Sequence, residues 1–173
     1  MNSGPRPSRD EWAMSMAVLT AKRATCLRRA VGCVLLNGRG HVLATGYNGV
    51  AAGRPHCNQE YEFKVLSRRF IGQQVSGAGV KTGPRYPHAC PGSQSESGTN
   101  LDACEAIHAE QNALLQCPNV YDIHTAYVTA SPCVTCTKLL LNTGCQRIVF
   151  LEEYPAPAAR ELWVSAGRSW EKY

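Results

Sequence analysis

Hydrophobic positions in the first third of the chain predict one helix followed by a β-hairpin. Ser8 and Glu11 have the spacing of a capping box, and a stripe of large apolar residues follows, which predicts a helix over about residues 9–24. The stripe consists of Trp12, Met16 and Leu19. Two β-rich runs, AVGCVLL and HVLATGY, then flank the turn sequence NGRG, an order typical of a hairpin.

The regular pattern breaks down between about residues 50 and 103. Gly, Pro, Ser and Asn dominate there, apart from one run with helical character, EYEFKVLSRRFI. A loop of this length inside a compact domain is uncommon unless something ties it down. Four candidate metal ligands lie in or beside it: His56, Cys57, His88 and Cys90.

Regular patterns return after this loop. We expect helices at about 104–116, 133–144 and 157–167, and strands at about 123–130 and 146–153. The order helix, hairpin, helix, strand, helix, strand, helix favours a mixed sheet covered by helices. Because 173 residues are typical of one domain, we expect a single α/β domain over 1–173, with an insertion at about 50–103.

The composition of the chain limits the cellular compartments and the binding partners that we expect. No run of about 18 apolar residues is present, and the N-terminus MNSGPRPSRDE lacks the apolar core of a secretory signal, so we expect a cytoplasmic protein. The formal net charge of +5 is mild, and its cations do not form the run that would favour a nucleic-acid polymer. The densest basic patch, KRATCLRR at 22–29, is either a solvated face or a contact for small anions.

Nine cysteines in a reducing compartment favour metal binding or chemistry over a disulfide framework. Cys33, Cys117 and Cys145 lie within apolar patterns and are interpreted as small buried hydrophobic residues. Cys133 and Cys136, in SPCVTC, come directly after a predicted strand and open a helix. This spacing puts both sulfurs on one helical turn, as two bonds to one zinc ion require, and the positive helix end favours their thiolate forms.

A second motif, EAIHAEQNALL, places His108 and Glu110 one residue apart in a helical pattern. Three ligands, His108, Cys133 and Cys136, would leave a fourth tetrahedral position open, as in catalytic zinc sites. Glu110 is poorly placed as a fourth ligand but well placed to move protons beside that position. His-x-Glu followed by Pro-Cys-x-x-Cys is the signature of zinc nucleobase deaminases and predicts hydrolytic deamination. The alternative is a closed zinc site without activity.

The chain resembles deoxycytidylate (dCMP) deaminases over most of residues 11–155. The matching segments are RRAVGCVLL, ATGYNGVAAGRPHC, AIHAEQNALL, AYVTASPCVTCTKLLLNTG and RIVFLEEY. The zinc motifs belong to the whole cytidine-deaminase-like superfamily, whereas GYNG, the downstream HC and AIHAEQNA are more particular to the dCMP enzymes. The resemblance implies a three-layer α-β-α fold with a mixed sheet of about five strands. It also implies conversion of dCMP to dUMP and ammonia in pyrimidine deoxynucleotide metabolism, on the route to dTTP.

The resemblance also assigns roles outside the zinc motifs. It implies substrate contacts from Asn48, the backbone of Ala109, Ser131 and Tyr154. An Asn-Gly dipeptide such as Asn48-Gly49 is, however, also a common turn that needs no ligand.

Members of the family are commonly hexamers activated by dCTP with Mg²⁺ and inhibited by dTTP. The resemblance ties the segment with Tyr47 and Gly49 to that regulation. Lys22, Arg28 and Arg29 are candidate phosphate contacts, for either the substrate or an effector.

Many bacterial and viral relatives hold a second, structural zinc, and Cys26 and Cys57 match its usual ligand positions. We expect Cys90 and Cys104 as the remaining ligands, with His56 and His88 as reserves; the alternative is a set of unbound loop cysteines. Such a metal would tie the long loop to the first helix. The tail after Tyr154 is short, so the last strand of larger relatives is expected to be missing or to be an edge strand.

Three rival interpretations remain. A polynucleotide deaminase acting on tRNA or single-stranded DNA would share the zinc motifs but need an extended basic groove with stacking aromatic residues. A free-nucleoside deaminase would need no cation for a phosphate. A non-catalytic zinc-binding module would have no use for Glu110.

Overall fold

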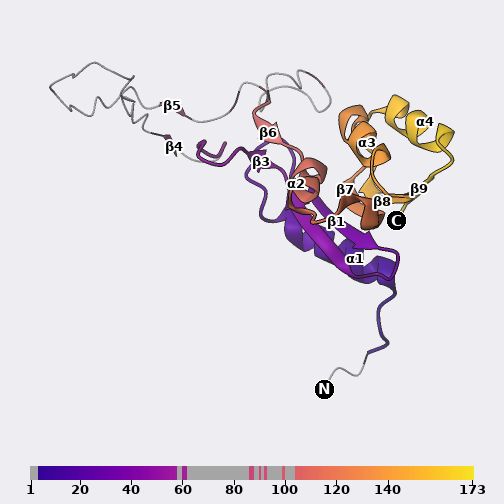
Figure 1. The fold of residues 1–173 in the computed structure, drawn as a ribbon. Helices are drawn as coiled ribbons and strands as arrows, with labels where there is room; N and C mark the ends of the chain where they lie inside the picture. The colour runs from indigo at the N-terminus through magenta and orange to yellow at the C-terminus, as the bar shows by residue number, and fades with distance from the viewer. Residues whose placement is uncertain are drawn as a thin grey trace, which may run out of the picture.

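A five-stranded mixed sheet, in the order β2-β1-β7-β8-β9, lies at the centre of the protein (Figure 1). The computed structural model describes residues 4–57, 60–61, 86–87, 90, 92, 99 and 104–173. The strands of the sheet are β1 (Gly32–Asn37), β2 (Val42–Tyr47), β7 (Ile123–Ala130), β8 (Arg147–Glu152) and β9 (Ser169–Lys172). β1 pairs antiparallel with β2 and β7, and β7, β8 and β9 run parallel. The predicted mixed sheet of about five strands is confirmed.

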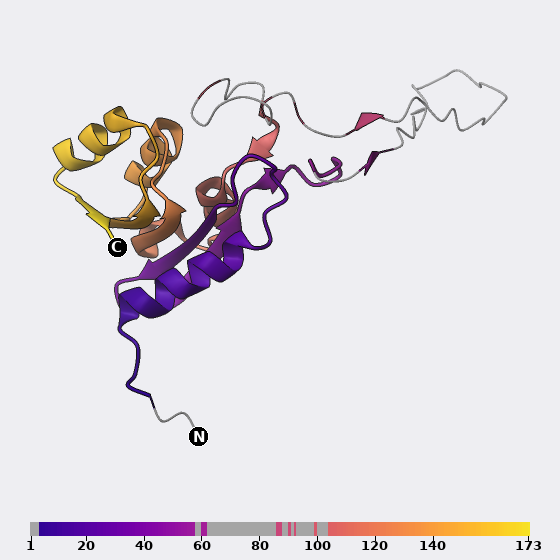
Figure 2. The same cartoon turned by 180° about the vertical axis from the view of Figure 1, so that it is seen from behind.

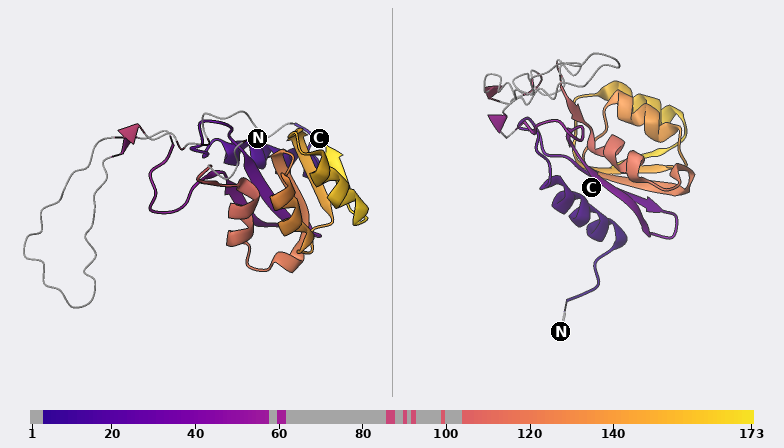
Figure 3. Two further views of the ribbon diagram at one scale, coloured as in Figure 1. Left: turned by 90° about the horizontal axis from the view of Figure 1, so that it is seen from above. Right: turned by 60° about the vertical axis from the view of Figure 1, so that its left-hand side comes forward.

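Helices cover both faces of this sheet, as Figures 1 and 2 show from opposite sides. They are α1 (Arg9–Ala21), α2 (Ala109–Gln116), α3 (Val134–Leu141) and α4 (Pro157–Ser165), with a short 3-10 helix η3 (Val120–Asp122). Val34 of β1 points into the core under α1, whereas Cys33 and Leu35 point into the core under the other three helices. Alternate residues of one strand therefore fill two cores, and the predicted α-β-α layers are confirmed (Figure 3). None of the described helices is long and apolar enough to cross a lipid bilayer.

The buried face of α1 is not the one that the apolar pattern indicated. Trp12 and Leu19 are 40% and 64% exposed. The residues buried against the sheet are Ala13, Met14, Ala17 and Ala21. Small residues are needed there because a Cβ atom on Gly32 would lie 2.1 Å from the carbonyl oxygen of Ala17. The capping box of Ser8 and Glu11 is present, but α1 ends at Ala21 rather than near residue 24.

The start of α2 also differs from the prediction. Ala106–Ile107 form β6, which pairs antiparallel with β3 (Gly49–Val50), so that α2 begins at Ala109 rather than near residue 104. A separate antiparallel pair joins β4 (Glu60–Tyr61) to β5 (Tyr86–Pro87). The helical interpretation of residues 60–71 is therefore wrong at its first two residues, and its remainder lies outside the described part of the chain.

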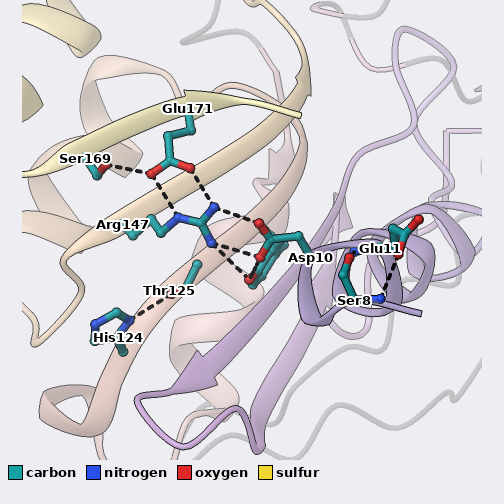
Figure 4. Close-up of polar contacts among 9 residues, drawn as sticks. Ser8, Asp10, Glu11, His124, Thr125, Arg147, Ser169 and Glu171 are labelled. Atoms are coloured by element: carbon teal, nitrogen blue, oxygen red, sulfur yellow. Dashed lines mark hydrogen bonds and ion pairs between the residues drawn. The ribbon is translucent and has the colours of Figure 1, made fainter. Parts of the chain in front are cut away.

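The C-terminal residues form the edge strand β9, which an ionic cluster fastens to α1. Arg147 of β8 lies between Asp10 of α1 and Glu171 of β9, and its Nη2 atom is 2.7 Å and 2.5 Å from their carboxylate oxygens (Figure 4). The Tyr127 hydroxyl donates a further hydrogen bond to Asp10. Three elements that are distant in sequence are thus held together at this edge of the sheet.

Replacing Asp10 by asparagine is expected to lower the free energy of unfolding by about 1 kcal/mol at pH 7. Hydrogen bonding to Arg147 holds the pKa of Asp10 at about 2, below its ordinary value of 3.8. A lowered folded-state pKa contributes stability above the ordinary value, and this contribution is lost as the pH falls towards 2. The side chain of Asp10 is 36% exposed, so solvent screening reduces the effect.

Thermal unfolding between pH 7 and pH 2 measures this difference in stability. The gap between Asp10→Asn and the unmodified protein should close as the pH falls, and a gap of constant size would contradict the explanation. Glu161→Gln, at an exposed carboxylate on α4, is the control and should leave stability unchanged at every pH.

A candidate metal centre at two helix N-termini

His108, Cys133 and Cys136 meet where α2 and α3 begin, and their ligand atoms all lie within 4.8 Å of one another. Nδ1 of His108 is 3.5 Å from Sγ of Cys133 and 3.3 Å from Sγ of Cys136. A tetrahedral zinc ion, with bonds of about 2.0 Å to nitrogen and about 2.3 Å to sulfur, separates such ligands by about 3.5 Å. The donor atoms and their spacing therefore fit one zinc ion.

Local structure fixes these ligands in place. His108 is the N-cap of α2, and its backbone N–H donates a 2.9 Å hydrogen bond to the side chain of Gln111. Cys133 is the N-cap of α3, three residues after the end of β7. Hydrogen bonds with Cys136 and His108 hold the pKa of Cys133 at about 4, so that this ligand is a thiolate at neutral pH. The hydrogen bond with Cys133 and burial instead raise the pKa of Cys136.

Glu110 lies beside the ligands in the first turn of α2 and is only 4% exposed. Its carboxyl group hydrogen-bonds with Cys136, and burial raises the pKa of Glu110 from 4.5 to about 7. Glu110 also lines the same pocket as His108 and Cys133. A carboxyl group so placed can exchange protons with a molecule held in that pocket.

Asn48, Ser131 and Tyr154 also line this pocket. Asn48 is buried, and its amide accepts a 2.8 Å hydrogen bond from the Val31 N–H and donates one of 2.7 Å to the Arg29 carbonyl. The Ser131 hydroxyl accepts a 2.7 Å hydrogen bond from the Tyr154 backbone N–H. One amide N–H of Asn48 and the hydroxyl proton of Ser131 are not used by these bonds.

Asn48-Gly49 is not a turn of the kind that an Asn-Gly dipeptide often forms. Gly49 begins β3, and it is not among the described glycines with positive φ. The positive-φ position of the predicted hairpin is Gly40, at φ +88° between β1 and β2. Asn48 instead ties the chain segment at residues 29–31 to the end of β2. Ala109, the other predicted backbone contact, also lines the pocket.

Two of the three candidate phosphate-binding cations lie at the pocket. Arg28 and Arg29 line it, whereas Lys22 is an exposed residue at the C-cap of α1. Arg28 donates hydrogen bonds of 3.0 Å and 2.7 Å to the carbonyl oxygens of Gly92 and Thr99. Arg29 lies over the Tyr154 ring, and its Nη1 atom is buried without a hydrogen-bond partner among the described residues.

The four cysteines predicted for a second metal interact with one another in pairs, but among the described residues only His108, Cys133 and Cys136 bring three ligand atoms within 4.8 Å of one another. Hydrogen bonds connect Cys90 with both Cys57 and Cys104, and Cys26 is near enough to influence the pKa of each. Burial raises the pKa of Cys57 and of Cys104. His56 instead pairs with Thr25, at 2.9 Å, and His88 lies outside the described residues. Of the three cysteines interpreted as hydrophobic, Cys33 and Cys145 are fully buried and Cys117 is partly exposed.

Comparison with known proteins identifies the family of this chain. Residues 7–152 match the family described as the cytidine and deoxycytidylate deaminase zinc-binding region. The chain belongs to this family. His108, Cys133 and Cys136 are accordingly the zinc site that the family's description names.

Relatives within this family carry the name deoxycytidylate deaminase. The protein of Mycobacterium phage D29 is 35% identical over 149 residues, which cover 86% of this chain and 98% of that protein. The Schizosaccharomyces pombe protein is also 35% identical, over 153 residues, but the chain spans only 38% of its length. The cyanophage S-TIM5 dCMP deaminase, solved with dCMP and dUMP, shares the fold with a TM-score of 0.65 at 22% identity, covering 98% of this chain and all of that one.

Sequence reasoning missed two residues that position α2. Gln111 caps the His108 N–H, and the side-chain amide of Asn112 donates a 2.8 Å hydrogen bond to the carbonyl of Tyr47. The first could have been found, because His108 and Gln111 have the N-cap to N3 spacing of a capping box. The second joins residues 65 apart in sequence, and no local pattern indicates it.

Proposed function

We propose that the protein is a zinc-dependent hydrolase that converts dCMP and water to dUMP and ammonia. The observation that carries the proposal is a three-ligand zinc site with the buried carboxyl group of Glu110 beside it in one pocket. Three protein ligands are what a catalytic zinc uses, because the fourth position stays open for water or substrate. The names of the relatives support cytosine, in a deoxynucleotide, as the base.

Each group at the site then has one task. Bound zinc supplies activated water, since it lowers the pKa of water from about 15.7 to about 7, which is worth about 12 kcal/mol at neutral pH. Glu110 would take up the two protons of the attacking water one after the other. It would deliver the first to the ring nitrogen and the second to the departing amine, which leaves as ammonia. General acid–base catalysis of this kind contributes about 10²–10⁴-fold. Asn48, Ser131 and the Ala109 backbone orient the nucleotide through the hydrogen-bonding groups that face the pocket.

Arg29 is the residue that we assign to the substrate phosphate. Its side chain is 31% exposed, yet Nη1 is buried and has no partner among the described residues. A buried guanidinium N–H without a partner costs free energy, which a phosphate oxygen in the pocket would recover. Glu152 lies 3.8 Å from the other terminal nitrogen and helps to hold the side chain in place.

Replacing Arg29 by alanine should raise KM for dCMP by about 10–100-fold, because a hydrogen bond to a charged group is worth about 1.5–3 kcal/mol. Turnover of deoxycytidine, which lacks the phosphate, should change by less than about threefold. Steady-state kinetics on both substrates, with Lys22→Ala as the control variant, make this comparison. An equal loss on dCMP and deoxycytidine would show that Arg29 only supports the fold of the pocket.

Ammonia release from dCMP, cytidine, dCTP and a single-stranded oligonucleotide tests the proposed reaction itself. The proposal predicts turnover of dCMP well above that of the other three. Turnover of the oligonucleotide but not of dCMP would show that the protein is a polynucleotide deaminase. Preference for cytidine over dCMP would show that it is a nucleoside deaminase. If the zinc-loaded protein releases no ammonia from any of the four substrates, the proposed reaction is wrong and the protein is a non-catalytic zinc-binding module.

The second zinc is also part of this proposal. Cys26, Cys57, Cys90 and Cys104 form the contacts described above, and four thiolates are a common ligand set of structural zinc. An ion there would join the end of α1 to residues 57, 90 and 104, beside the substrate pocket that Cys26 and Cys104 line. Metal analysis should then return about two zinc ions per chain. A value of one zinc ion per chain would contradict the proposed second site.

Regulation and assembly remain predictions from the family resemblance alone. These are activation by dCTP with Mg²⁺, inhibition by dTTP and a hexameric assembly. A cytoplasmic location is a separate prediction from the composition of the chain. Within the described structure, Tyr47 receives the cation–π contact of Arg23, and Gly49 lies beside Thr25, so both predicted effector residues are near the basic segment at 22–29. The assays above, repeated with dCTP and dTTP, test the regulation.

A further inference from the structure

A second pocket lies at the opposite end of β1 from the proposed active site. Val31, just before β1, lines the active-site pocket, whereas Gly40 and His41, just after it, line the second one. Six residues of extended strand between them span about 20 Å. Figure 2 shows this end of the molecule, where the chain enters α1 beside the turn between β1 and β2. The Tyr47–Gly49 segment lies at the other end of the same hairpin.

The charge of this second pocket is strongly positive. It has a volume of about 640 Å³, within the range of small-molecule sites, and its lining includes Arg6, Arg9, Trp12, Arg39, Gly40 and His41. None of the three arginine side chains makes a hydrogen bond or ion pair with another described residue, although the charge of Arg9 acts on the carboxylate of Asp10, which pairs with Arg147. The nearby carboxylate of Glu11 is already engaged by the Ser8 N–H at 2.7 Å. Asp122 lines an adjacent cavity with Arg39 and His41 rather than this one.

Trp12 gives the pocket an aromatic surface as well. Its side chain is 40% exposed because the small residues of α1, not the large ones, pack on the sheet. A solvent-accessible indole beside unpaired guanidinium groups is the combination that binds a nucleotide, since the ring stacks on a base and the cations hold phosphates. Neither feature takes part in the deamination chemistry described above.

We propose that this pocket binds a nucleoside polyphosphate, with Trp12 stacked on the base and Arg6, Arg9 and Arg39 on the phosphates. Three cations suit a di- or triphosphate better than a monophosphate. The Arg9 side chain is already held in place, because it packs against Gly40, where a Cβ atom would lie 2.7 Å from its Nε atom. The site is separate from the pocket proposed for dCMP and does not depend on that reaction.

Calorimetric titration with ATP and with inorganic tripolyphosphate tests the proposal, because a purine is not a substrate of the proposed reaction. Both probes should bind saturably at one site. Arg39→Ala should raise the Kd of both probes by about tenfold or more. Trp12→Ala should raise the Kd of ATP by at least about fivefold and change the Kd of tripolyphosphate by no more than about twofold. Arg160→Ala, at an exposed cation on α4, removes the same charge and should change neither. Deamination of dCMP should continue in all three variants.

Several results would overturn the proposal. The first is that neither probe binds saturably. The second is that Arg39→Ala leaves the affinity for the probes unchanged, and the third is that Arg39→Ala and Arg160→Ala lower this affinity equally. An equal loss of both probes in Trp12→Ala would show that the indole shapes the pocket rather than stacking on a base. If a single-stranded oligonucleotide displaces ATP and binds more tightly as its length increases, the surface belongs to a nucleic-acid polymer instead. Failure of deamination with intact ATP binding would contradict only the proposed enzymatic function.

Discussion

Replacing Glu110 by alanine is expected to lower kcat for dCMP by at least about 10²–10⁴-fold while the zinc content stays the same. Glu110 is buried in the pocket beside the ligands but is not needed to complete their three-donor set. Burying a carboxyl group costs free energy, so its removal should not reduce the free energy of unfolding. Steady-state kinetics, metal analysis and thermal unfolding of one preparation measure the three quantities.

Two further variants make the Glu110 result specific. Glu110→Gln keeps the shape of the side chain and should be as inactive as Glu110→Ala, because an amide cannot shuttle protons. Glu161→Ala, on the exposed surface of α4, should be fully active. Activity of Glu110→Gln above about a tenth of normal would mean that another group moves the protons, and the role given to Glu110 would be wrong.

Replacing Gly46 by alanine is expected to destabilise the protein by about 3 kcal/mol or more, at the upper end of the usual cost of overpacking. A Cβ atom at this position would lie 2.2 Å from the carbonyl oxygen of Ala109 and 2.4 Å from the backbone nitrogen of Ala113. Both are backbone atoms of α2 and cannot move aside alone. The helix that carries His108 and Glu110 must therefore shift away from β2.

The loss in Gly46→Ala should appear as a lower unfolding temperature and as lower deaminase activity even where the protein remains folded. Gly38→Ala is the matched control, because the nearest atom to its added Cβ would be 3.9 Å away and its φ is not positive. Unchanged stability and activity in Gly46→Ala would contradict the close packing of α2 on β2. This packing is also a physical reason for glycine at the first position of the GYNG segment.

The sheet could be predicted from the sequence because its inner strands are short runs of apolar and β-branched residues between turn residues. β1 is buried along five of its six residues, and β7 is nearly as apolar. The predicted face of α1 was wrong for a physical reason. The pattern was read from large residues, whereas close approach of helix and strand at Gly32 selects small ones. Sequence periodicity does not record how near two elements lie.

Non-local pairing explains the other errors of the fold prediction. Residues 104–107 are compatible with a helix, but Ala106–Ile107 pair with Gly49–Val50, more than fifty residues earlier in the chain. The edge strand β9 likewise depends on its parallel pairing with β8 and on the bond from Arg147 to Glu171. Neither partner is visible in the local sequence.

The zinc ligands and Glu110 could be predicted because they occur in two pairs, and the residues of each pair are close in sequence. Cys133 and Cys136 are one helical turn apart, and His108 is the N-cap of α2 and Glu110 lies in its first turn. The cations were harder to assign, since 22–29 contains several and only the tertiary structure places Arg28 and Arg29 at the pocket. The exposed Trp12 and the arginine-lined pocket at its side depend on the same tertiary packing.

Diffraction at the zinc absorption edge tests the central claim most directly, because the anomalous signal locates each metal ion separately. The account predicts an ion bound by Nδ1 of His108 and by Sγ of Cys133 and Cys136, at about 2.0 Å and about 2.3 Å, with no protein side chain at its fourth position on the side facing Glu110. An ion enclosed by a fourth side chain, or a zinc-loaded crystal without an ion at these three residues, would contradict it.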